Sequence, residues 1–298
     1  MKILKIILYV LLFLTFVIVV FINVNPQFGA NPNKSQKLFY SNFQNFKSGE
    51  FKNNEPTALF TDEMSFWDFF KTELNREPVK EIIPLEMDVE SFVSSDKGDF
   101  KLVWLGHSAF IMNISGKVIL LDPMLGSHAA PLPLPSLKRY SSQIAFDINE
   151  LDKIDFVILS HDHYDHLDYP TIKKIKDKVV RFIVPYGIGN HLTSWGVNKE
   201  SIIELNWEQS CKYDDIEFIC LPARHFSGRG PLNRNSTLWS SWAIKNKKGK
   251  VYFSGDSGYG SHFKKIGKEH GPFDFSLIDC GQYNKAWKYS HMFPKQAI

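Results

Sequence analysis

Eight residues, 161–168, constrain this chain more than any other stretch. They read His-Asp-His-Tyr-Asp-His-Leu-Asp and follow an apolar, β-branched run at 156–160. Such a run predicts a buried strand that ends in a polar loop. Imidazole nitrogens and carboxylate oxygens are ligands for zinc and similar divalent cations. Because so many imidazoles and carboxylates at one strand end would be costly without a cation, the stretch predicts a metal-binding loop rather than an ordinary solvated one.

The spacing within this loop divides its side chains between two ions. His161 and His163 stand two residues apart, so both can face one ion from a bent loop. Asp165 and His166 can then turn toward a second ion beside the first. One loop cannot supply every ligand of a two-metal site, and further ligands are therefore expected at the ends of other strands.

Two such positions occur later in the chain. His225 follows an apolar run at 218–221, in the same way that the loop histidines follow their strand. Asp256 follows the strand predicted at 251–253 and has a glycine close on each side. Glycines let the backbone approach an ion closely, and a carboxylate can bridge two cations through its two oxygens. We therefore predict that both residues are metal ligands.

Length and composition narrow the function classes. The 298 residues contain 22% charged and 14% aromatic side chains, which is typical of a globular chain that buries a sizeable core. A formal charge of +3, with no basic stripe among aromatics, does not indicate a nucleic-acid partner. Three cysteines without C-x-x-C spacing indicate neither a disulfide framework nor a thiolate metal site.

The N-terminus carries an apolar run at 6–22. It predicts a transmembrane helix, so that residues 1–23 form a single-pass membrane anchor. A cleaved signal peptide is the main alternative, and a buried helix of a soluble protein is the third. Lys2 and Lys5 favour a cytoplasmic N-terminus and an extracytoplasmic catalytic domain, although two lysines soon after the run oppose that orientation.

The rest of the chain divides into a lead-in region and a main domain. Residues 24–98 are expected to pack on the main domain, with a helix at 63–74 whose aromatic stripe faces the core. The main domain is predicted to span 99–298. It should contain two packed sheets with helices outside, built from helices at 170–178 and 187–195 and strands at 101–105, 109–114, 117–121, 156–160, 181–184, 202–205, 216–221, 238–245, 250–254 and 273–278.

The order of these motifs resembles the metallo-β-lactamase superfamily. The loop at 161–166, then His225, then the Ser-Gly-Asp-Ser-Gly run around Asp256 are similar to its metal motifs. The flanking stretches are similar to the branch that contains N-acyl-phosphatidylethanolamine phospholipase D: Trp-Leu-Gly-His-Ser at 104–108, Leu-Asp-Pro at 121–123, Trp-Ser-Ser-Trp at 239–242, Gly-Pro-Phe-Asp at 271–274, Gly-Gln-Tyr at 281–283, and His291. The resemblance covers the chain from about residue 100 onward.

The resemblance implies an α+β fold, an αββα sandwich with two zinc ions at the edges of its sheets. Carried over residue by residue, one zinc would be held by His161, His163 and His225, the other by Asp165 and His166, and Asp256 would bridge them. Asp165 and His291 would be catalytic, and His291 would bind or protonate the substrate beside the two neighbouring substrate-binding candidates, Gln282 and Tyr283.

The chain departs from the family in two places. Asn-Lys-Ala at 284–286 stands where the phospholipase pattern has Glu-Pro-Arg, which leaves the lipid substrate open. The superfamily also supplies a further histidine to the second zinc from a later strand, and no residue here matches it. We therefore expect that the C-terminal part of the fold is missing from this sequence and that its second zinc site lacks one ligand.

Three further side chains have two readings each. Asp168 either orients a ligand imidazole or caps the following helix. His107 is expected to contact a ligand residue or to lie in the core rather than to bind a metal itself. Arg229 is expected to be a solvated charge in its loop rather than a contact of the substrate. The proline-rich stretch at 131–135 is either a plain connector or a border of the substrate entrance.

The predicted function is a zinc-dependent phosphodiesterase of phospholipase D type. It would act on a lipid such as N-acyl-phosphatidylethanolamine or on another small amphiphile, with the N-terminal helix holding it at the membrane. One alternative is a lactonase or other metal-dependent ester hydrolase, because the same activated water attacks a carbonyl. Another is a membrane-tethered protein that has lost turnover.

Overall fold

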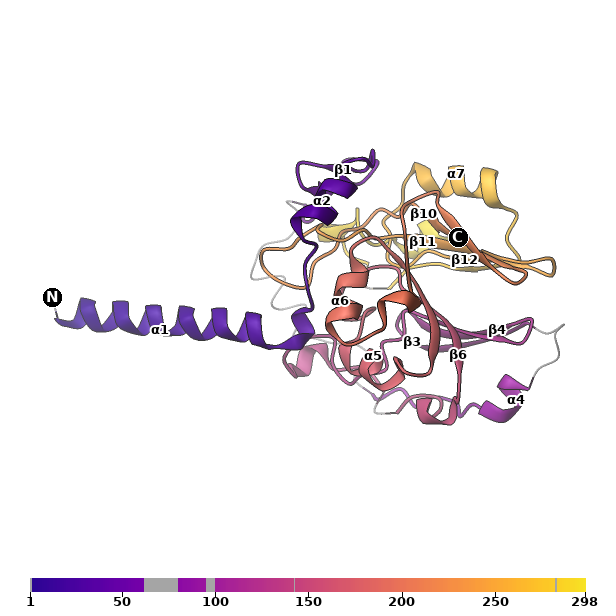
Figure 1. Cartoon of the computed structure of the whole chain (residues 1–298), viewed down its shortest axis with the longest axis horizontal. Coiled ribbons are helices and arrows are strands. Elements are labelled where there is room, and N and C mark those ends of the chain that lie inside the picture. Colours follow the sequence, from indigo (N-terminus) through magenta and orange to yellow (C-terminus); the bar gives the residue numbers. More distant parts are fainter. Residues whose placement is uncertain (1, 62–79, 95–99, 142, 282) are drawn as a thin grey trace.

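A six-stranded sheet forms one half of the main domain in the computed structural model, which describes residues 2–61, 80–94, 100–141, 143–281 and 283–298 (Figure 1). Its strand order is β3-β4-β5-β6-β7-β8. The first three strands form an antiparallel meander and the last four run parallel. Their bounds are β3 Phe100–Gly106, β4 Ala109–Ile114, β5 Lys117–Leu121, β6 Ile154–Ile158, β7 Val179–Pro185 and β8 Ile202–Leu205.

A five-stranded sheet in the order β13-β12-β11-β10-β9 forms the other half. It is antiparallel except that β13 runs parallel to β12. Its strands are β9 Ser210–Tyr213, β10 Ile216–Leu221, β11 Ser241–Lys245, β12 Lys250–Phe253 and β13 Phe275–Leu277.

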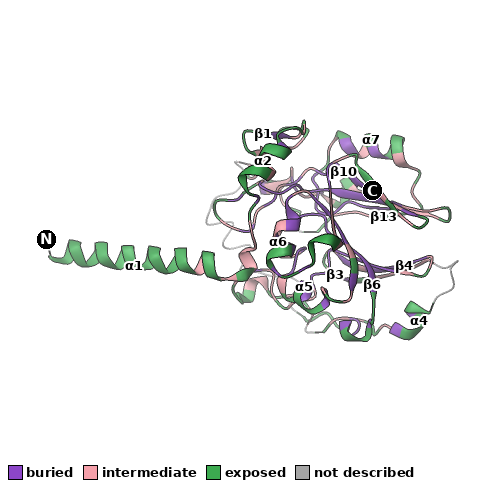
Figure 2. Cartoon of the chain, viewed as in Figure 1, coloured by how far each residue is buried: buried purple, intermediate pink, exposed green. Residues whose placement is uncertain are grey.

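The two sheets face each other across one apolar core. Side chains of both sheets meet there, among them Met112, Phe156, Phe218 and Trp242. Helices α5 (Tyr169–Ile175) and α6 (Ile188–Ser194) pack on the outer face of the six-stranded sheet, and α7 (Ser261–His270) packs on the other sheet. Figure 2 shows the buried residues gathered in these strands. The layer order is αββα, so the predicted fold class is confirmed.

Most predicted strands lie within a residue or two of the observed ones, and the exceptions have local causes. The strand predicted at 238–245 begins only at Ser241, because the backbone amides of Leu238 and Ser240 are diverted to Tyr186 and Ser160. The predicted hairpin turn at Ser115 and Gly116 is confirmed, and both residues have the positive φ that a tight hairpin needs. Helix α7 was not foreseen, because only His262 and Ile266 of its ten residues are buried.

The N-terminal helix α1 (Lys2–Val24) projects from the domain with no buried residue (Figures 1 and 2). Its mean hydropathy of 3.0 over an 18-residue window makes it long and apolar enough to cross a membrane. A short 3-10 helix, η1 (Pro26–Phe28), follows at the surface of the domain.

The lead-in region packs its aromatic residues against the main domain. It contains α2 (Lys34–Tyr40), β1 (Phe46–Lys47), β2 (Glu50–Phe51) and α4 (Val89–Val93). Tyr40, Phe46 and Phe51 form one cluster with Leu238 and Trp239. The helix predicted at 63–74 lies outside the described residues, and the division of the chain at residues 23 and 98 stays a prediction. The remaining short helices are η2 (Pro135–Leu137), η3 (Ile148–Glu150), η4 (Lys199–Ser201), η5 (Lys285–Trp287) and α8 (Pro294–Ala297).

Candidate metal centre

The predicted ligands meet because the strands that precede them end at the same edge of the sandwich. The loop 161–168 follows β6. His225 and Asp256 follow β10 and β12, which point the same way since each is antiparallel to β11 between them. The amide of Ser240 donates a 2.9 Å hydrogen bond to the carbonyl of Ser160, which joins the two sheets directly before the loop.

Three imidazole nitrogens converge at this edge. His163 Nδ1 lies 2.8 Å from His161 Nε2 and 3.2 Å from His225 Nε2. The carbonyl of Ser290 accepts a hydrogen bond of 3.0 Å from His225 Nδ1, so Nε2 of that neutral ring carries a lone pair. Nitrogen ligands about 2.0–2.1 Å from a tetrahedral zinc are spaced only slightly further apart than these atoms are. The trio therefore fits one cation.

A second group lies beside the first. His166 Nε2 is 3.1 Å from Asp256 Oδ2 and 3.8 Å from Asp165 Oδ2. Asp256 Oδ2 is also 3.9 Å from Nε2 of His225 in the first group. The Asp256 carboxylate thus stands between the two groups, as a bridging ligand would. Nε2 of His166 is buried and has no hydrogen-bond partner within the described part of the chain, which leaves its lone pair for a cation.

Asp122 at the end of β5 fixes the orientation of the His166 ring. Its Oδ2 accepts a 2.7 Å hydrogen bond from His166 Nδ1 and a short one from the hydroxyl of Ser160, while Oδ1 accepts from the Ser160 amide at 2.7 Å. A carboxylate behind a ligand imidazole sets its tautomer and raises its basicity. Asp122 has a positive φ of 39°, a strained conformation of the kind found at functional sites. The sequence predicts no role for Asp122 beyond the resemblance of the Leu-Asp-Pro stretch at 121–123 to the family.

The charges in this region call for a cation. Burial lowers the pKa of His161 and of His225 well below that of a free histidine, so both rings stay neutral. Burial would also lower the pKa of His166, but the surrounding carboxylates, led by Asp256, raise it well above the ordinary value. Burial would raise the pKa of Asp256, yet the nearby imidazoles, His166 first, hold it well below the usual range. Positive charge is therefore favoured between these carboxylates, and the donor set fits divalent metal.

Two acidic residues of the loop serve its structure instead. Asp168 caps α5 by accepting hydrogen bonds from the amide of Thr171 at 3.1 Å and from its hydroxyl at 2.5 Å. Of its two predicted readings, the cap is therefore the one observed. Asp162 is fully buried, and its carboxylate accepts hydrogen bonds from the amide of Gly228 and the hydroxyl of Thr237, both at 2.7 Å.

His291 lies beside the ligand groups, as the resemblance implies. Its Nδ1 is 3.0 Å from Asp279 Oδ2 and 3.9 Å from Asp256 Oδ2. Burial would lower the pKa of His291, but these two carboxylates raise it above the ordinary value. Asp279, which follows β13, was not predicted, since an isolated Asp-Cys-Gly gives no motif. Tyr283 is half exposed and contacts the ring of Phe293, while Gln282 lies outside the described residues.

Three more side chains, His107, Arg229 and Asn53, have contacts that their positions in the sequence do not specify. His107 is partly exposed, and its Nε2 is 2.9 Å from Asp165 Oδ2, so it lies next to the second ligand group. Arg229 was expected in solvent but is 2% exposed. Asn53 of the lead-in region accepts from the amide of His225 at 3.1 Å and donates to its carbonyl at 2.7 Å. No sequence signal connects positions 172 residues apart.

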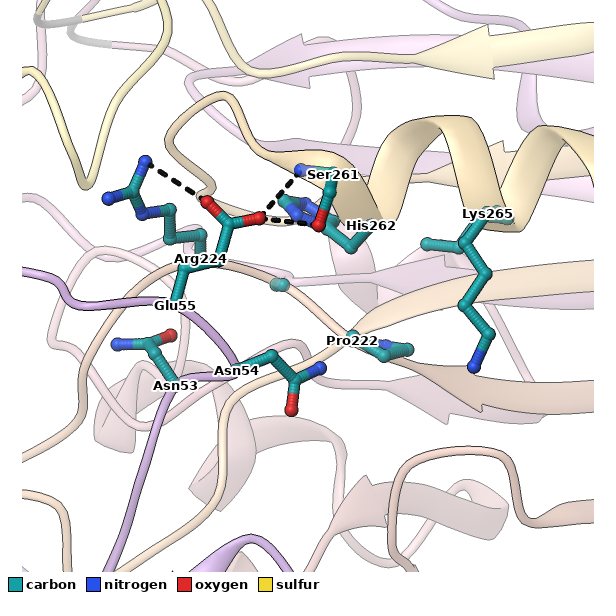
Figure 3. A pocket seen from close by; sticks show the side chains of 10 residues that line it. Asn53, Asn54, Glu55, Pro222, Arg224, Ser261, His262 and Lys265 are labelled. Atoms are coloured by element: carbon teal, nitrogen blue, oxygen red, sulfur yellow. Dashed lines mark hydrogen bonds and ion pairs between the residues drawn. The ribbon is translucent and has the colours of Figure 1, made fainter.

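Figure 3 shows how Glu55 of the lead-in region is bound to Ser261 and Arg224 of the main domain. The carboxylate of Glu55 accepts hydrogen bonds from the amide and the hydroxyl of Ser261, and it lies 3.8 Å from the Arg224 guanidinium. A cavity of about 80 Å³ remains between these parts, lined by Asn53, Asn54, Glu55, Pro222, Ala223, Arg224, Ser261, His262, Lys265 and Ile266.

Comparison with known proteins matches the part of the chain that carries this centre. A family model described as a beta-lactamase superfamily domain matches residues 117–298. An uncharacterised protein of Mycobacterium tuberculosis is 37% identical over 85% of this chain and 68% of its own length. The N-acyl-phosphatidylethanolamine-hydrolyzing phospholipase D 1 of Caenorhabditis elegans is 34% identical over 68% of this chain and 60% of its own.

The fold also resembles a solved structure. An isothiocyanate hydrolase from Delia radicum gut bacteria superposes with a TM-score of 0.52 and 18% identity, and the match covers 65% of this chain and 77% of that one. At this identity the likeness concerns the fold alone. It agrees with the αββα layers described above.

The orienting role of Asp122 can be tested by replacing it with asparagine. An amide cannot accept all the hydrogen bonds that the carboxylate now receives, so the His166 ring loses its support. We expect Asp122→Asn to lower zinc affinity about 10–100-fold, measured by competition with a chelator. Asp155→Asn is the matched control, because Asp155 is also buried and accepts a backbone hydrogen bond but lies at the other end of β6. Equal affinities in the two variants would refute the role.

Proposed function

This chain belongs to the beta-lactamase superfamily and is a metal-dependent hydrolase, and on that premise we propose that it is a two-zinc phosphodiesterase acting on a phospholipid. The observation that carries the proposal is the position of Asp256 between two groups of buried ligands. Two adjacent cations suit phosphodiesters, whose transition state spreads negative charge over several oxygens.

The ligand assignment follows the two groups. His161, His163 and His225 would hold one zinc, Asp165 and His166 would hold the other, and Asp256 would be the ligand shared between them. Zinc ions held there would supply positive charge for the phosphoryl oxygens and a water molecule acidic enough to act as a nucleophile near pH 7. Asp165 is less buried than Asp256 or Asp279, so its carboxylate could also orient a water molecule.

His291 provides the proton for the leaving group. Burial would lower its pKa, but Asp256 and Asp279 raise it above the ordinary value, which favours the protonated ring. Its Nδ1 donates to Asp279, which leaves the other ring nitrogen to donate outward. When the P–O ester bond of a phosphodiester breaks, the alcohol part departs as an alkoxide, and protonation of that oxygen by His291 lowers the barrier.

The lipid assignment rests on what surrounds α1. A relative of this chain is a phospholipase by name, and α1 is long and apolar enough to hold the domain at a bilayer. Leu132, Leu134 and Leu232 are 47%, 46% and 98% exposed. Their two loops touch the segment after α1, through Pro131 bonded to Asn25 and Gly230 next to Phe28, so these apolar side chains lie where the helix leaves the domain.

The proposal also includes the orientation of the chain in the membrane and the bounds of its three regions. Lys2 and Lys5 before the apolar run favour a cytoplasmic N-terminus and a catalytic domain outside the cytoplasm, against the opposing effect of Lys34 and Lys37. The anchor covers residues 1–23, the lead-in region 24–98 and the hydrolase domain 99–298.

The proposal is tested on the full chain in detergent, stripped of metal and reloaded with zinc. We expect two zinc ions per chain and a zinc-dependent release of the headgroup part from N-acyl-phosphatidylethanolamine or another phosphodiester lipid. A panel of lactones and simple esters serves as the comparison. Activity confined to that panel would replace the phosphodiesterase by an ester hydrolase. One zinc or none, without turnover on any substrate, would favour a tethered protein that does not catalyse.

The proton-donating role predicts a loss of turnover without a loss of metal. His291→Ala should lower kcat about 10²–10⁴-fold, while the zinc content stays at the wild-type value. His128→Ala is the control, because His128 contacts its neighbour Ser127 away from the ligand groups. A fall in bound zinc in His291→Ala would instead make His291 a ligand.

The membrane-facing leucines predict a difference between two forms of substrate. Leu232→Asp should lower the rate on phospholipid in bilayers about tenfold, since a buried leucine contributes roughly 1.5 kcal/mol to membrane contact. The rate on a soluble, short-chain phosphodiester should stay unchanged. Val93→Asp, at an exposed apolar site on α4 across the domain from α1 (Figure 1), is the control for the added charge. Equal losses on both substrates would contradict a role in membrane contact.

A further inference from the structure

The residues that follow α1 contact the domain specifically and do not merely connect to it. We call residues 25–31 the junction segment. The carbonyl of Pro26 accepts a 2.7 Å hydrogen bond from Trp195 Nε1, and the carbonyl of Gln27 accepts one of 2.8 Å from Arg229 Nε. A simple tether would need neither bond, so these contacts point to a further role.

Arg229 connects the junction segment to the metal loop. Its Nη1 donates to the carbonyls of Asp162 and Leu167, each at 2.7 Å, and thereby holds the loop near both of its ends. The guanidinium lies over the rings of Tyr164 and Trp195, with its central carbon 4.1 and 5.1 Å from their centroids. Because the side chain is 2% exposed, this arrangement is desolvated and fixed in place.

His191 makes a second connection. The amide of Ala30 donates to His191 Nδ1 at 3.0 Å, so the proton of the neutral ring is on Nε2. That nitrogen is 3.3 Å from Asp162 Oδ2, to which it donates. His191 is fully buried, and Asp162 stands in the chain between two of the proposed zinc ligands. The junction segment thus sets the tautomer of His191, in which Nε2 carries the proton that is donated to Asp162 of the metal loop.

We propose that the junction segment is part of the support of the metal loop, with Arg229 and His191 as the positioning residues that transmit its docking to the zinc ligands. Docked, the segment completes the hydrogen bonds that hold Asp162 and the loop ends. Detached, it leaves Arg229 Nε and His191 Nδ1 without their partners, and the loop loses its fixed geometry. The inference rests on the two-zinc site proposed above.

The test detaches the segment without altering the domain. Gly29 has φ +67°, and a Cβ there would lie 2.1 Å from His191 Nδ1, so Gly29→Ala should undock the segment in the full chain. Gly49→Ala is the matched control, since φ is +82° and a Cβ there would meet nothing within 4 Å. We expect Gly29→Ala to lower zinc affinity at least about tenfold and to unprotect the Ala30 amide against hydrogen exchange, with no such change in the control.

A second variant breaks the same connection from the domain side. Arg229→Lys keeps the charge but cannot make the forked contacts, so zinc affinity should fall to a similar degree. Because undocking the segment already takes the Gln27 carbonyl away from Arg229, the loss of affinity in the double variant should be smaller than the sum of the two single losses. Wild-type affinity in both single variants, or two losses that add, would overturn the inference. A wild-type chain that binds no zinc would instead refute the proposed function.

Discussion

The attraction between a cation and a cluster of buried carboxylates and neutral imidazoles is the interaction on which this centre depends. Asp256 carries its charge at 4% exposure, and the nitrogens of His161 and His163 approach to 2.8 Å. Without a cation, such a cluster must take up protons, and the raised pKa of His166 between carboxylates shows that demand. The orienting hydrogen bonds therefore keep the lone pairs of the imidazole rings available to a cation, as a metal site requires.

The fold places these ligands by bringing two sheets close together at one edge. Gly255 illustrates how closely they approach: a Cβ there would lie 2.5 Å from Cβ of Ser160, and φ is +53°. Only glycine meets both conditions, and it directly precedes Asp256, the proposed bridging ligand. Ser160 in turn binds Asp122 through its amide and its hydroxyl. The apolar core between the sheets thus determines the separation of groups that lie beyond the strand ends.

Sequence reasoning recovered the parts of this centre that follow local rules. The loop 161–166 follows a buried strand and carries its own spacing, and the strand positions of β4, β5, β8 and β10 came from apolar patterns. What failed depended on distant contacts. Asn53 and Asp279 lie in sequence surroundings without a motif, and the family-like stretch around Asp122 indicates no role for it; each acts because the fold brings it to one of the site histidines. Arg229 was placed in solvent for the same reason: its partners come from residues far along the chain.

The junction segment and the exposed leucines give the position of α1 a chemical meaning. Phe28 packs edge-on against Tyr164 of the metal loop, and Asn31 is bonded to Asn233, one residue after Leu232. One short stretch of chain thus contacts the metal loop and both loops that carry the leucines. If α1 crosses a bilayer, the centre is held at a fixed height and orientation above it. A hydrolase so held would meet the membrane surface in one geometry, and that restriction would select among membrane-bound substrates before any contact within the site does.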